Sequence, residues 1–256
     1  MRSLREVFVL IKVENLHKSF GDKKIFEGLD LDIYDGETIT VIGQSGEGKS
    51  VLLKHIMGLM DPDEGRVLID GEDITNAHYN KKTEIRKKIG MLFQMAALFD
   101  SMTVKENVAF ALREHTRFGD EEIDKVVKKK LAIVNLRGVE HLMPAEISGG
   151  MKKRVSLARA LSMDPEIILY DEPTTGLDPV TADIINNLIV DLQKKLNVTS
   201  VVVTHDMTSA FKVSNRIAML YNKKIHFVGT TDEVRNSEDA VIRQFVNGEA
   251  EGPLTE

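Results

Sequence analysis

The sequence predicts an α/β protein in which a parallel-sheet core carries an inserted helical subdomain. Two observations lead to this prediction. Short apolar and β-branched runs alternate with segments of helical periodicity. This alternation is found on both sides of residues 104–145, a stretch that reads as mostly helical, with charged faces and few β-branched residues. The length of 256 residues is enough for one large domain, or for one domain with a subdomain.

The elements before the helical stretch follow from local patterns. Strands are predicted for VFVLIKVENL, KIFEGLDLDI and TITVIG, for RVLIDG after the turn DPDEG, and for IGMLFQ at 89–94. KSVLLKHIMGL is predicted as a helix, because Val51, Leu52, His55 and Leu59 recur at helical spacing.

After residue 145 the alternation returns. EIILYDE and VTSVVVTH read as strands, PVTADIINNLIVDLQKKL and DMTSAFKVS as helices, and RIAMLYNKKIHFVG as a hairpin. The last ten residues, NGEAEGPLTE, read as a polar tail.

Composition excludes several classes of function. With 42% hydrophobic and 29% charged residues, the chain has the composition of soluble globular proteins. Its net charge of −6 argues against a nucleic-acid partner, since such proteins usually carry a basic excess. Because there is no cysteine, disulfides, thiolate metal sites and a cysteine nucleophile are excluded.

No stretch of the sequence is expected to cross a membrane. The apolar runs at 7–11 and 200–203 fall far short of the roughly 20 residues that a membrane-spanning helix needs. Lys12 interrupts the N-terminal run too early for the core of a signal peptide, so this run is predicted to be the first strand. A role at a membrane would therefore depend on a partner.

The strongest chemical signal is GQSGEGKS at 43–50, between the strand TITVI and the helix that begins near Lys49. This is the phosphate-loop pattern in the structural context that it requires. The glycines allow the backbone N–H groups to surround phosphate, Lys49 neutralises the outer phosphates, and the Ser50 hydroxyl is a ligand for Mg²⁺. Glu47 is unexpected in an anion site, and we expect its side chain to point to solvent while its backbone N–H contributes.

IILYDE at 167–172 is an apolar strand that ends in two acids. Ligands of open α/β sheets bind at the carboxyl ends of the strands. Neighbouring strand residues point in opposite directions, so the two carboxylates can take different roles. Asp171 is the candidate ligand of Mg²⁺ and Glu172 the candidate base for an attacking water. Without the phosphate loop, such a pair would read as a solvated turn.

Two further strands end in polar residues. VTSVVVTH ends in His205, a candidate sensor of the γ-phosphate, although a lone histidine is more often structural. IGMLFQ ends in Gln94, whose amide can reach a metal ion or water, while the following loop leads into the helical stretch. Gln94 is therefore a candidate link between the chemistry and the helical subdomain.

The stretch ISGGMKKRVSLARAL begins with the features of a helix start. Ser148 is in the position of an N-cap, and Gly149 and Gly150 follow it. The free N–H groups and the dipole of such a helix start attract anions. The sequence pattern does not identify the anion.

Taken together, these motifs resemble the nucleotide-binding subunit of ABC transporters along nearly the whole chain. Their order is the phosphate loop, Gln94, ISGGM in place of the usual LSGGQ, Asp171–Glu172, GLD at 176–178, and His205. The resemblance implies a P-loop, RecA-like core with an N-terminal antiparallel β subdomain and an inserted helical subdomain. The core would cover about 1–94 and 163–230, the helical signature subdomain about 95–162, and a C-terminal helix and tail about 231–256.

The resemblance also implies an enzyme that hydrolyses ATP with Mg²⁺. The residues expected to bind ATP are Phe20, which would stack on adenine, and the loop Gly43, Gln44, Ser45, Gly46, Glu47, Gly48, Lys49, Ser50 and Val51. The catalytic set would be Lys49, Gln94, Glu172 and His205, and the metal ligands Ser50, Gln94 and Asp171. A core aromatic is the alternative interpretation of Phe20.

A head-to-tail homodimer is a further implication of the resemblance. In it, Ser148, Gly149 and Gly150 would bind the γ-phosphate held by the partner subunit's phosphate loop. The resemblance therefore implies that the anion bound by this helix start is the γ-phosphate of ATP held by the partner subunit. Asp178 would lie at the same interface and couple the two sites. ATP would join the two subunits, and hydrolysis would weaken that contact.

Residues 91–116 and 171–185 are similar to the ATPases of Mla-type systems, and so is Met151 in SGGMKKR. Such systems pair the ATPase with an integral-membrane permease and an MCE-domain protein, and they move phospholipids or related lipids. The resemblance places the chain at the cytoplasmic face of the inner membrane, held there by the permease. Residues 95–104 are either a groove for that permease or the core of the subdomain. Met151, Val155 and Ala158 share a helix face, so Met151 also fits a packing role.

Other functions remain in competition. An ABC ATPase that regulates a membrane partner, such as a cell-division complex, would have the same fold and site. Translation-factor and DNA-repair ABC proteins are disfavoured, because they normally carry two ATPase domains or zinc cysteines. A P-loop kinase is disfavoured by the signature helix.

Overall fold

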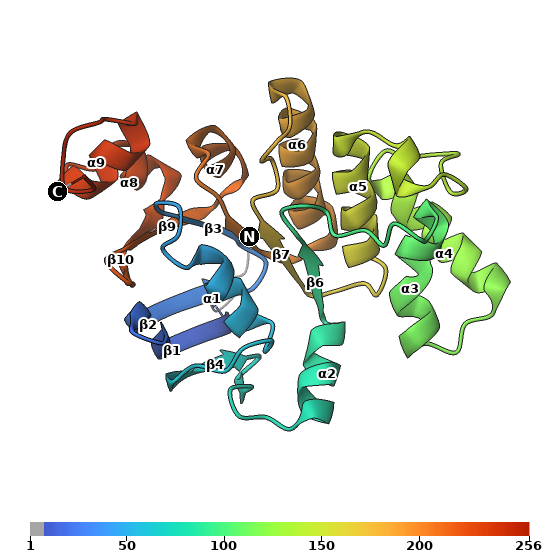
Figure 1. Ribbon diagram of the computed structural model, residues 1–256, viewed down its shortest axis with the longest axis horizontal. Helices are drawn as coiled ribbons and strands as arrows, with labels where there is room; N and C mark the ends of the chain where they lie inside the picture. Colours follow the sequence, from blue (N-terminus) through green and yellow to red (C-terminus); the bar gives the residue numbers. More distant parts are fainter. Residues whose placement is uncertain (1–7, 256) are drawn as a thin grey trace, which may run out of the picture. The chain divides into compact units, whose positions relative to one another are not determined.

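The computed structural model describes residues 8–255. They divide into two compact units: a first unit within Met1–Lys82 and Val201–Glu256, and a second unit of Thr83–Ser200. Figure 1 shows the chain coloured along the sequence and labels most of its helices and strands.

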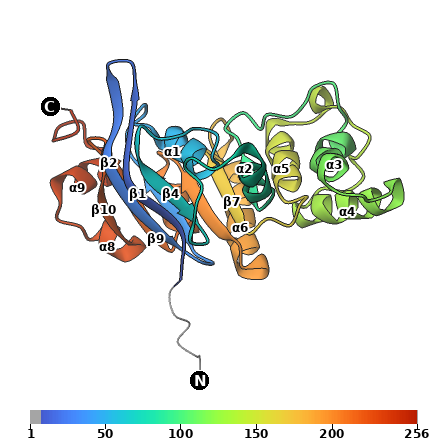
Figure 2. The same ribbon diagram turned by 90° about the horizontal axis from the view of Figure 1, so that it is seen from below.

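The first unit contains an antiparallel sheet in the order β2-β1-β4-β5 (Figure 2). Its strands are β1 (Val9–Phe20), β2 (Lys23–Tyr34), β4 (Glu64–Ile69) and β5 (Glu72–Asp73). Apolar residues alternate along β1 and β2, which puts Leu16, Leu29 and Ile33 in the interior with no exposed surface.

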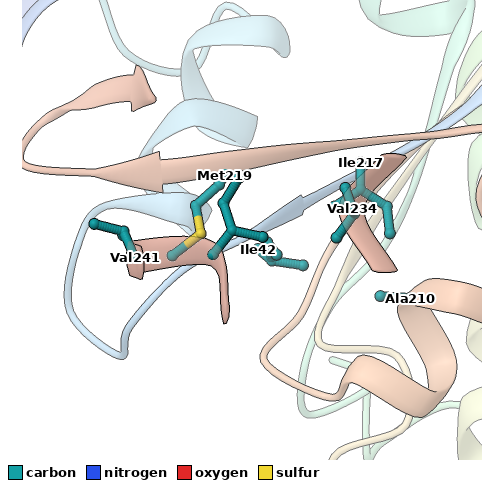
Figure 3. Packing of buried hydrophobic residues seen from close by; sticks show 7 residues of the cluster. Ile42, Ala210, Ile217, Met219, Val234 and Val241 are labelled. Atoms are coloured by element: carbon teal, nitrogen blue, oxygen red, sulfur yellow. The ribbon is translucent and has the colours of Figure 1, made fainter. Parts of the chain in front are cut away.

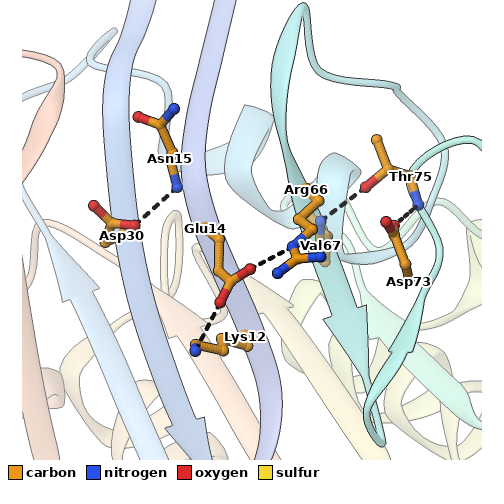
Figure 4. Close-up of polar contacts among 8 residues, drawn as sticks. All are labelled: Lys12, Glu14, Asn15, Asp30, Arg66, Val67, Asp73 and Thr75. Atoms are coloured by element: carbon orange, nitrogen blue, oxygen red, sulfur yellow. Dashed lines mark hydrogen bonds and ion pairs between the residues drawn. The ribbon is translucent and has the colours of Figure 1, made fainter.

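Polar contacts help to hold this sheet in register (Figure 4). Glu14 of β1 accepts from Lys12 at 2.7 Å and from Arg66 of β4. The backbone N–H of Asn15 donates to Asp30 of β2 at 2.8 Å, next to an irregularity in the β1–β2 pairing. The Glu14–Arg66 and Asn15–Asp30 contacts link β1 to its two neighbours, next to the interruptions of the ladder.

A second sheet has the strand order β10-β9-β3-β8-β7-β6. Its strands are β3 (Thr38–Ile42), β6 (Ile89–Leu92), β7 (Ile167–Asp171), β8 (Thr199–Val203), β9 (Arg216–Tyr221) and β10 (Lys224–Thr230). β3 is parallel to β9 and β6 is parallel to β7, whereas β9 and β10 form an antiparallel hairpin. Every residue of β3, β6 and β8 is buried, as expected for parallel strands covered on both faces.

The helices of the first unit include α1 (Lys49–Ile56), α7 (Met207–Val213), α8 (Thr231–Arg235) and α9 (Ala240–Asn247). α2 (Tyr79–Lys87) precedes β6. One buried cluster joins β3 and β9 to the C-terminal helices (Figure 3). It consists of Ile42, Ala210, Ile217, Met219, Val234, Val241 and Ile242.

The second unit contains most of the helical stretch. Its helices are α3 (Val104–His115), α4 (Asp120–Ile133), the short 3₁₀ turn Pro144–Glu146, α5 (Gly149–Ala160) and α6 (Pro179–Leu196). A capping box of Thr103 and Glu106 starts α3. The buried side chains Val104, Val108 and Leu112 then repeat at helical spacing along α3.

The predicted fold class is confirmed, with three local differences. Residue 7 of the predicted first strand lies outside the described residues, and β1 begins at Val9. β6 ends at Leu92, two residues before Gln94. The C-terminal segment is not a free polar tail. The Gln244 side chain accepts from Leu254 N–H at 2.7 Å and donates to the Glu249 carbonyl at 3.2 Å.

Candidate functional site

The phosphate loop joins the buried strand β3 to α1. Gly48 precedes α1 with φ +105°, a conformation that residues with a side chain rarely adopt. A Cβ at this position would lie 2.5 Å from Ile25 Cγ2, so close packing also requires glycine. Lys49 is only 7% exposed, and its ammonium donates to the carbonyls of Gly43 at 2.8 Å and Gln44 at 2.9 Å. The loop therefore curls around the lysine head group.

The interpretation of Glu47 as a solvent-facing side chain is wrong. Its Oε2 is buried without a hydrogen-bond partner among the described residues, and it lies near the Gly43 backbone. Burial raises the pKa of Glu47, and the nearby Lys49 only partly offsets this. The curl of the loop turns the side chain inward, which the residue pattern does not indicate.

Gln44, Ser45 and His205 line one pocket of the first unit, together with residues of α9 and of the segment after it. His205 follows β8 and is exposed. The Gln44 side chain donates to the Leu254 carbonyl at 2.9 Å. The structure thus brings His205 to the phosphate loop, as predicted from the sheet edge, and adds a C-terminal contact that the sequence analysis missed.

Phe20 ends β1 and is 47% exposed, so the alternative of a core aromatic is wrong. The ammonium of Lys18 lies 5.8 Å from the centre of its ring. Ser50 and Val51 follow Lys49 in the first turn of α1, and both are half-buried.

Asp171 and Glu172 lie at the end of β7 in the second unit. Asp171 is the last residue of the strand. Glu172 is already outside it, in a left-handed conformation with φ +47°. The expected strand alternation between the two carboxylates is therefore wrong, because it requires both residues to be in the strand. Glu172 is 9% exposed, and Thr175 Oγ1 donates to its carboxylate at 3.1 Å.

The signature stretch forms the predicted helix start. Ser148 is the N-cap of α5, and its Oγ accepts from Met151 N–H at 3.3 Å. Gly149 is exposed, whereas Gly150 is buried against α6. A Cβ on Gly150 would lie 2.4 Å from Thr181 Cγ2. The second glycine therefore has a packing function in addition to any role in anion binding.

Gln94 follows β6 and is exposed. The next residues include Ala96 and Ala97, both with positive φ. Arg159 of α5 donates to the carbonyls of Ala96 at 3.0 Å and Ala97 at 2.7 Å. Lys153 of α5 donates to the Gln94 carbonyl. The signature helix thus holds the loop that begins at Gln94.

The ABC transporter family model matches residues 26–175, which include the phosphate loop, Gln94, the signature helix start and the carboxylate pair. The chain belongs to the ABC transporter family. As a member, it binds ATP and hydrolyses it.

Known proteins agree with this membership. A probable ribonucleotide transport ATP-binding protein of Mycobacterium leprae is 46% identical over 96% of this chain and 71% of its own length. The intermembrane phospholipid transport ATP-binding protein MlaF of Haemophilus influenzae is 41% identical over 96% of this chain and 93% of its own. A dimeric ATP-binding cassette solved with ADP and phosphate superposes with a TM-score of 0.80 and 34% identity, covering 86% of this chain and 98% of that one.

Asp178 of this ABC protein is the N-cap of α6. Its carboxylate accepts from Val180 N–H at 3.1 Å and Thr181 N–H at 3.0 Å. Hydrogen bonds from the side chain and backbone of Thr181 hold the pKa of Asp178 below its usual value. Asp178 is nevertheless exposed, so its carboxylate remains accessible from outside the chain while it caps α6.

The loop after Gln94 carries exposed apolar side chains. Met95 is 87% exposed and Phe99 43%, while Leu98 and Met102 are half-buried. The Phe99 ring lies 4.9 Å from that of Phe110, which is also exposed. Ala96 and Val104 of the same segment are buried, so residues 95–104 combine a packed part with an exposed apolar part. We call Met95, Leu98, Phe99 and Phe110 the loop patch.

Within residues 8–255, no helix is both long enough and apolar enough to cross a bilayer. Over the same range, no group of three or more His, Cys, Asp or Glu side chains is arranged to hold a metal ion.

Proposed function

We propose that the chain is the ATPase of a transporter that moves phospholipids or related lipids across a membrane envelope. The observation that carries this proposal is its similarity to the phospholipid transport protein over nearly the whole of both chains. The relative named for ribonucleotide transport has the higher identity, but about three tenths of its length lies outside the match. Lipid is therefore the favoured cargo, and a nucleotide is the competing one.

The working form is a two-fold homodimer in which each ATP touches both subunits. The capped start of α5 supports this proposal, because Ser148 and Gly149 are exposed at a helix N-terminus that attracts phosphate. The dimeric state of the similar cassette also supports it. Asp178 lies at this interface and couples the two composite sites.

In each site, Phe20 stacks on adenine and the loop from Gly43 to Val51 surrounds the phosphates. Lys49 neutralises the outer phosphates. Glu172 accepts a proton from water as its oxygen attacks the γ-phosphorus, and the bond to the β–γ bridging oxygen breaks, which gives ADP and phosphate. His205 contacts the γ-phosphate, and Gln94 links the site to the loop patch.

Ser50, Gln94 and Asp171 would hold Mg²⁺. A hydroxyl, an amide oxygen and a carboxylate are the hard oxygen donors that this cation prefers, so the residues present fit the ion. Bound there, Mg²⁺ would neutralise charge on the phosphates.

The proposed partners are an integral-membrane permease and an MCE-domain lipid-binding protein. The loop patch supports the first, because exposed aromatic and Met side chains suit the apolar face of a partner helix. The chain would then be peripheral, at the cytoplasmic face of the inner membrane, and held there by the permease.

Reconstitution tests the cargo. The chain and its permease are placed in vesicles that contain fluorescent phospholipid and radiolabelled nucleoside monophosphate, and the ATP-dependent movement of each is followed. Glu172→Gln, which should slow hydrolysis about 100- to 10,000-fold while ATP still binds, is the negative control. Phospholipid movement that is absent in the control supports the proposal. Nucleotide movement alone, or hydrolysis without movement of either, contradicts it.

Mixed dimers test the composite site. Ser148→Arg adds bulk at the helix start, whereas Lys49→Ala damages the phosphate loop. A dimer with one copy of each has one site with both faults and one site with neither, provided that each site is built from two chains. Both variants are co-expressed with different tags, and nucleotide trapping by the doubly tagged species is measured. Trapping no greater than in the parent homodimers contradicts the two-chain site.

A further inference from the structure

Lys153 of α5 is a buried cation that joins three segments of the second unit. Its side chain is 5% exposed. Its ammonium donates to the backbone carbonyl of Gln94, after β6, and to that of Glu172, after β7, at 3.2 Å. Lys153 itself lies four residues after Gly149, the first residue of the signature helix. One side chain therefore touches the backbone of two candidate catalytic residues.

The burial of this ammonium has a physical cost that its surroundings offset. Desolvation lowers the pKa of Lys153, and the negative charges of Asp171 and Glu172 act in the opposite direction. A lysine head group has three donors and no acceptor, so backbone carbonyls are suitable partners. An apolar side chain of about the same length, such as Met, would leave both carbonyls without this donor.

The conformation of Glu172 makes the contact important. Its positive φ is a strained state for a residue with a side chain, and it persists only when the surroundings enforce it. Lys153 holds the carbonyl end of the residue, and Thr175 holds the carboxylate. Because the side-chain direction follows from the backbone dihedrals, a rotation of this peptide would move the carboxylate.

We propose that Lys153 is a positioning residue for ATP hydrolysis, which sets the place of the Glu172 carboxylate by fixing the backbone at Glu172 and at Gln94. The inference rests on the proposed role of Glu172 as the base. The Arg159 contacts to Ala96 and Ala97 extend the same arrangement, since they fix the loop that Gln94 begins. A displacement of α5 would then move both Gln94 and Glu172.

A double-mutant cycle in the full chain tests the proposal. Lys153→Met keeps the length of the side chain and removes every donor. We expect kcat for ATP to fall about 10- to 100-fold, the usual effect of a misplaced catalytic group, while ATP affinity is unchanged. In the Glu172→Gln background the same substitution should cause no further loss, because the group that it positions is already absent.

Two matched variants separate positioning from stability. Lys130→Met removes another buried ammonium of the second unit, one that pairs with Asp164 at 2.5 Å, and should lower the melting temperature without lowering kcat. Lys152→Met removes the neighbouring, half-exposed charge and should change neither. If Lys153→Met does not fold, Lys153→Leu, which also removes every donor, carries the same cycle.

Normal kcat in the folded Lys153 variant overturns the proposal. So does an equal fold-loss in both backgrounds, because Lys153 then acts by a route other than Glu172. So does a loss of kcat in Lys130→Met as large as that in Lys153→Met. Near-normal turnover of Glu172→Gln alone is a different result. It removes Glu172 from the proposed function, and the positioning role of Lys153 falls with it.

Discussion

Replacing Gly150 by alanine puts a methyl group where α6 already lies. The added Cβ would be 2.4 Å from Thr181 Cγ2, whereas carbon atoms in contact normally lie about 3.5–4.0 Å apart. The start of α5 or the Thr181 side chain must therefore move by about 1 Å or more. Such overpacking costs about 1–3 kcal/mol. For a chain of this size, we expect the melting temperature to fall by about 2–12 °C.

The neighbouring glycine is the matched control. A Cβ on Gly149 would meet only Leu177 Cδ2, at 4.0 Å, which is ordinary contact. Gly149→Ala should therefore leave the melting temperature unchanged or raise it slightly, since alanine is the better helix former. Thermal unfolding of both variants without nucleotide measures the difference directly.

A compensating substitution makes the prediction sharper. Thr181→Ser removes the methyl group that clashes and keeps the hydroxyl that hydrogen-bonds Asp178. In the double variant, Gly150→Ala with Thr181→Ser, we expect most of the lost stability to return. Nucleotide trapping, which the displaced helix start of Gly150→Ala should weaken, should recover as well, because the helix start regains its position. If Thr181→Ser gives no recovery, or if both glycine variants lose stability equally, the packing explanation for Gly150 is wrong.

Three further predictions concern other parts of the molecule. Glu47→Gln should raise the melting temperature at pH 7. Burial raises the pKa of the Glu47 carboxyl, so the folded protein loses stability as pH rises from the ordinary pKa of 4.5 through the pKa of the folded state. The gain should vanish below pH 4.5, and a gain that persists there contradicts the titration argument. Leu98→Ala with Phe99→Ala should reduce co-purification with the permease while ATP still binds, whereas lost stability with intact binding would make these residues structural. Gln244→Ala should speed hydrogen exchange of the segment around Leu254. It should also weaken ATP affinity about 2- to 10-fold, which corresponds to the loss of one hydrogen bond. Unchanged exchange would show that Gln244 does not hold this segment.

The parts of the fold that could be predicted are those determined by residues close together in the sequence. β3, the phosphate loop and α1 follow one another within about twenty residues, and each has its own local signal. The cap at Ser148 was predicted for the same reason, because an N-cap bonds only to its own first turn. The buried parallel strands were predicted from their continuous apolar runs.

Conformations that depend on the surroundings could not be predicted in this way. The turn of Glu47 into the phosphate loop reflects backbone curvature, and the contacts of the left-handed Glu172 include one from Lys153, 19 positions away. Polar composition suggested a free tail, yet the Leu254 carbonyl accepts from Gln44, 210 positions away. Because every residue has a backbone carbonyl, the residue types do not indicate which carbonyl will accept such a hydrogen bond.

The same reasoning explains why the contacts of α5 were not visible in the motifs. Lys153 and Arg159 donate to main-chain carbonyls of Gln94, Ala96, Ala97 and Glu172, and every residue type offers such an acceptor. The loop after Gln94 can therefore change its side chains, and with them its partner, while its attachment to the signature helix stays the same. If α5 is the element that reaches ATP on the other subunit, these carbonyl contacts tie its position to Glu172, the proposed base, and to the loop patch through the same two cations. A substitution that removes the donors should then uncouple ATP hydrolysis from partner binding, whereas substitution of the exposed Ala97 by glycine, which also adopts a positive φ, should leave the two coupled.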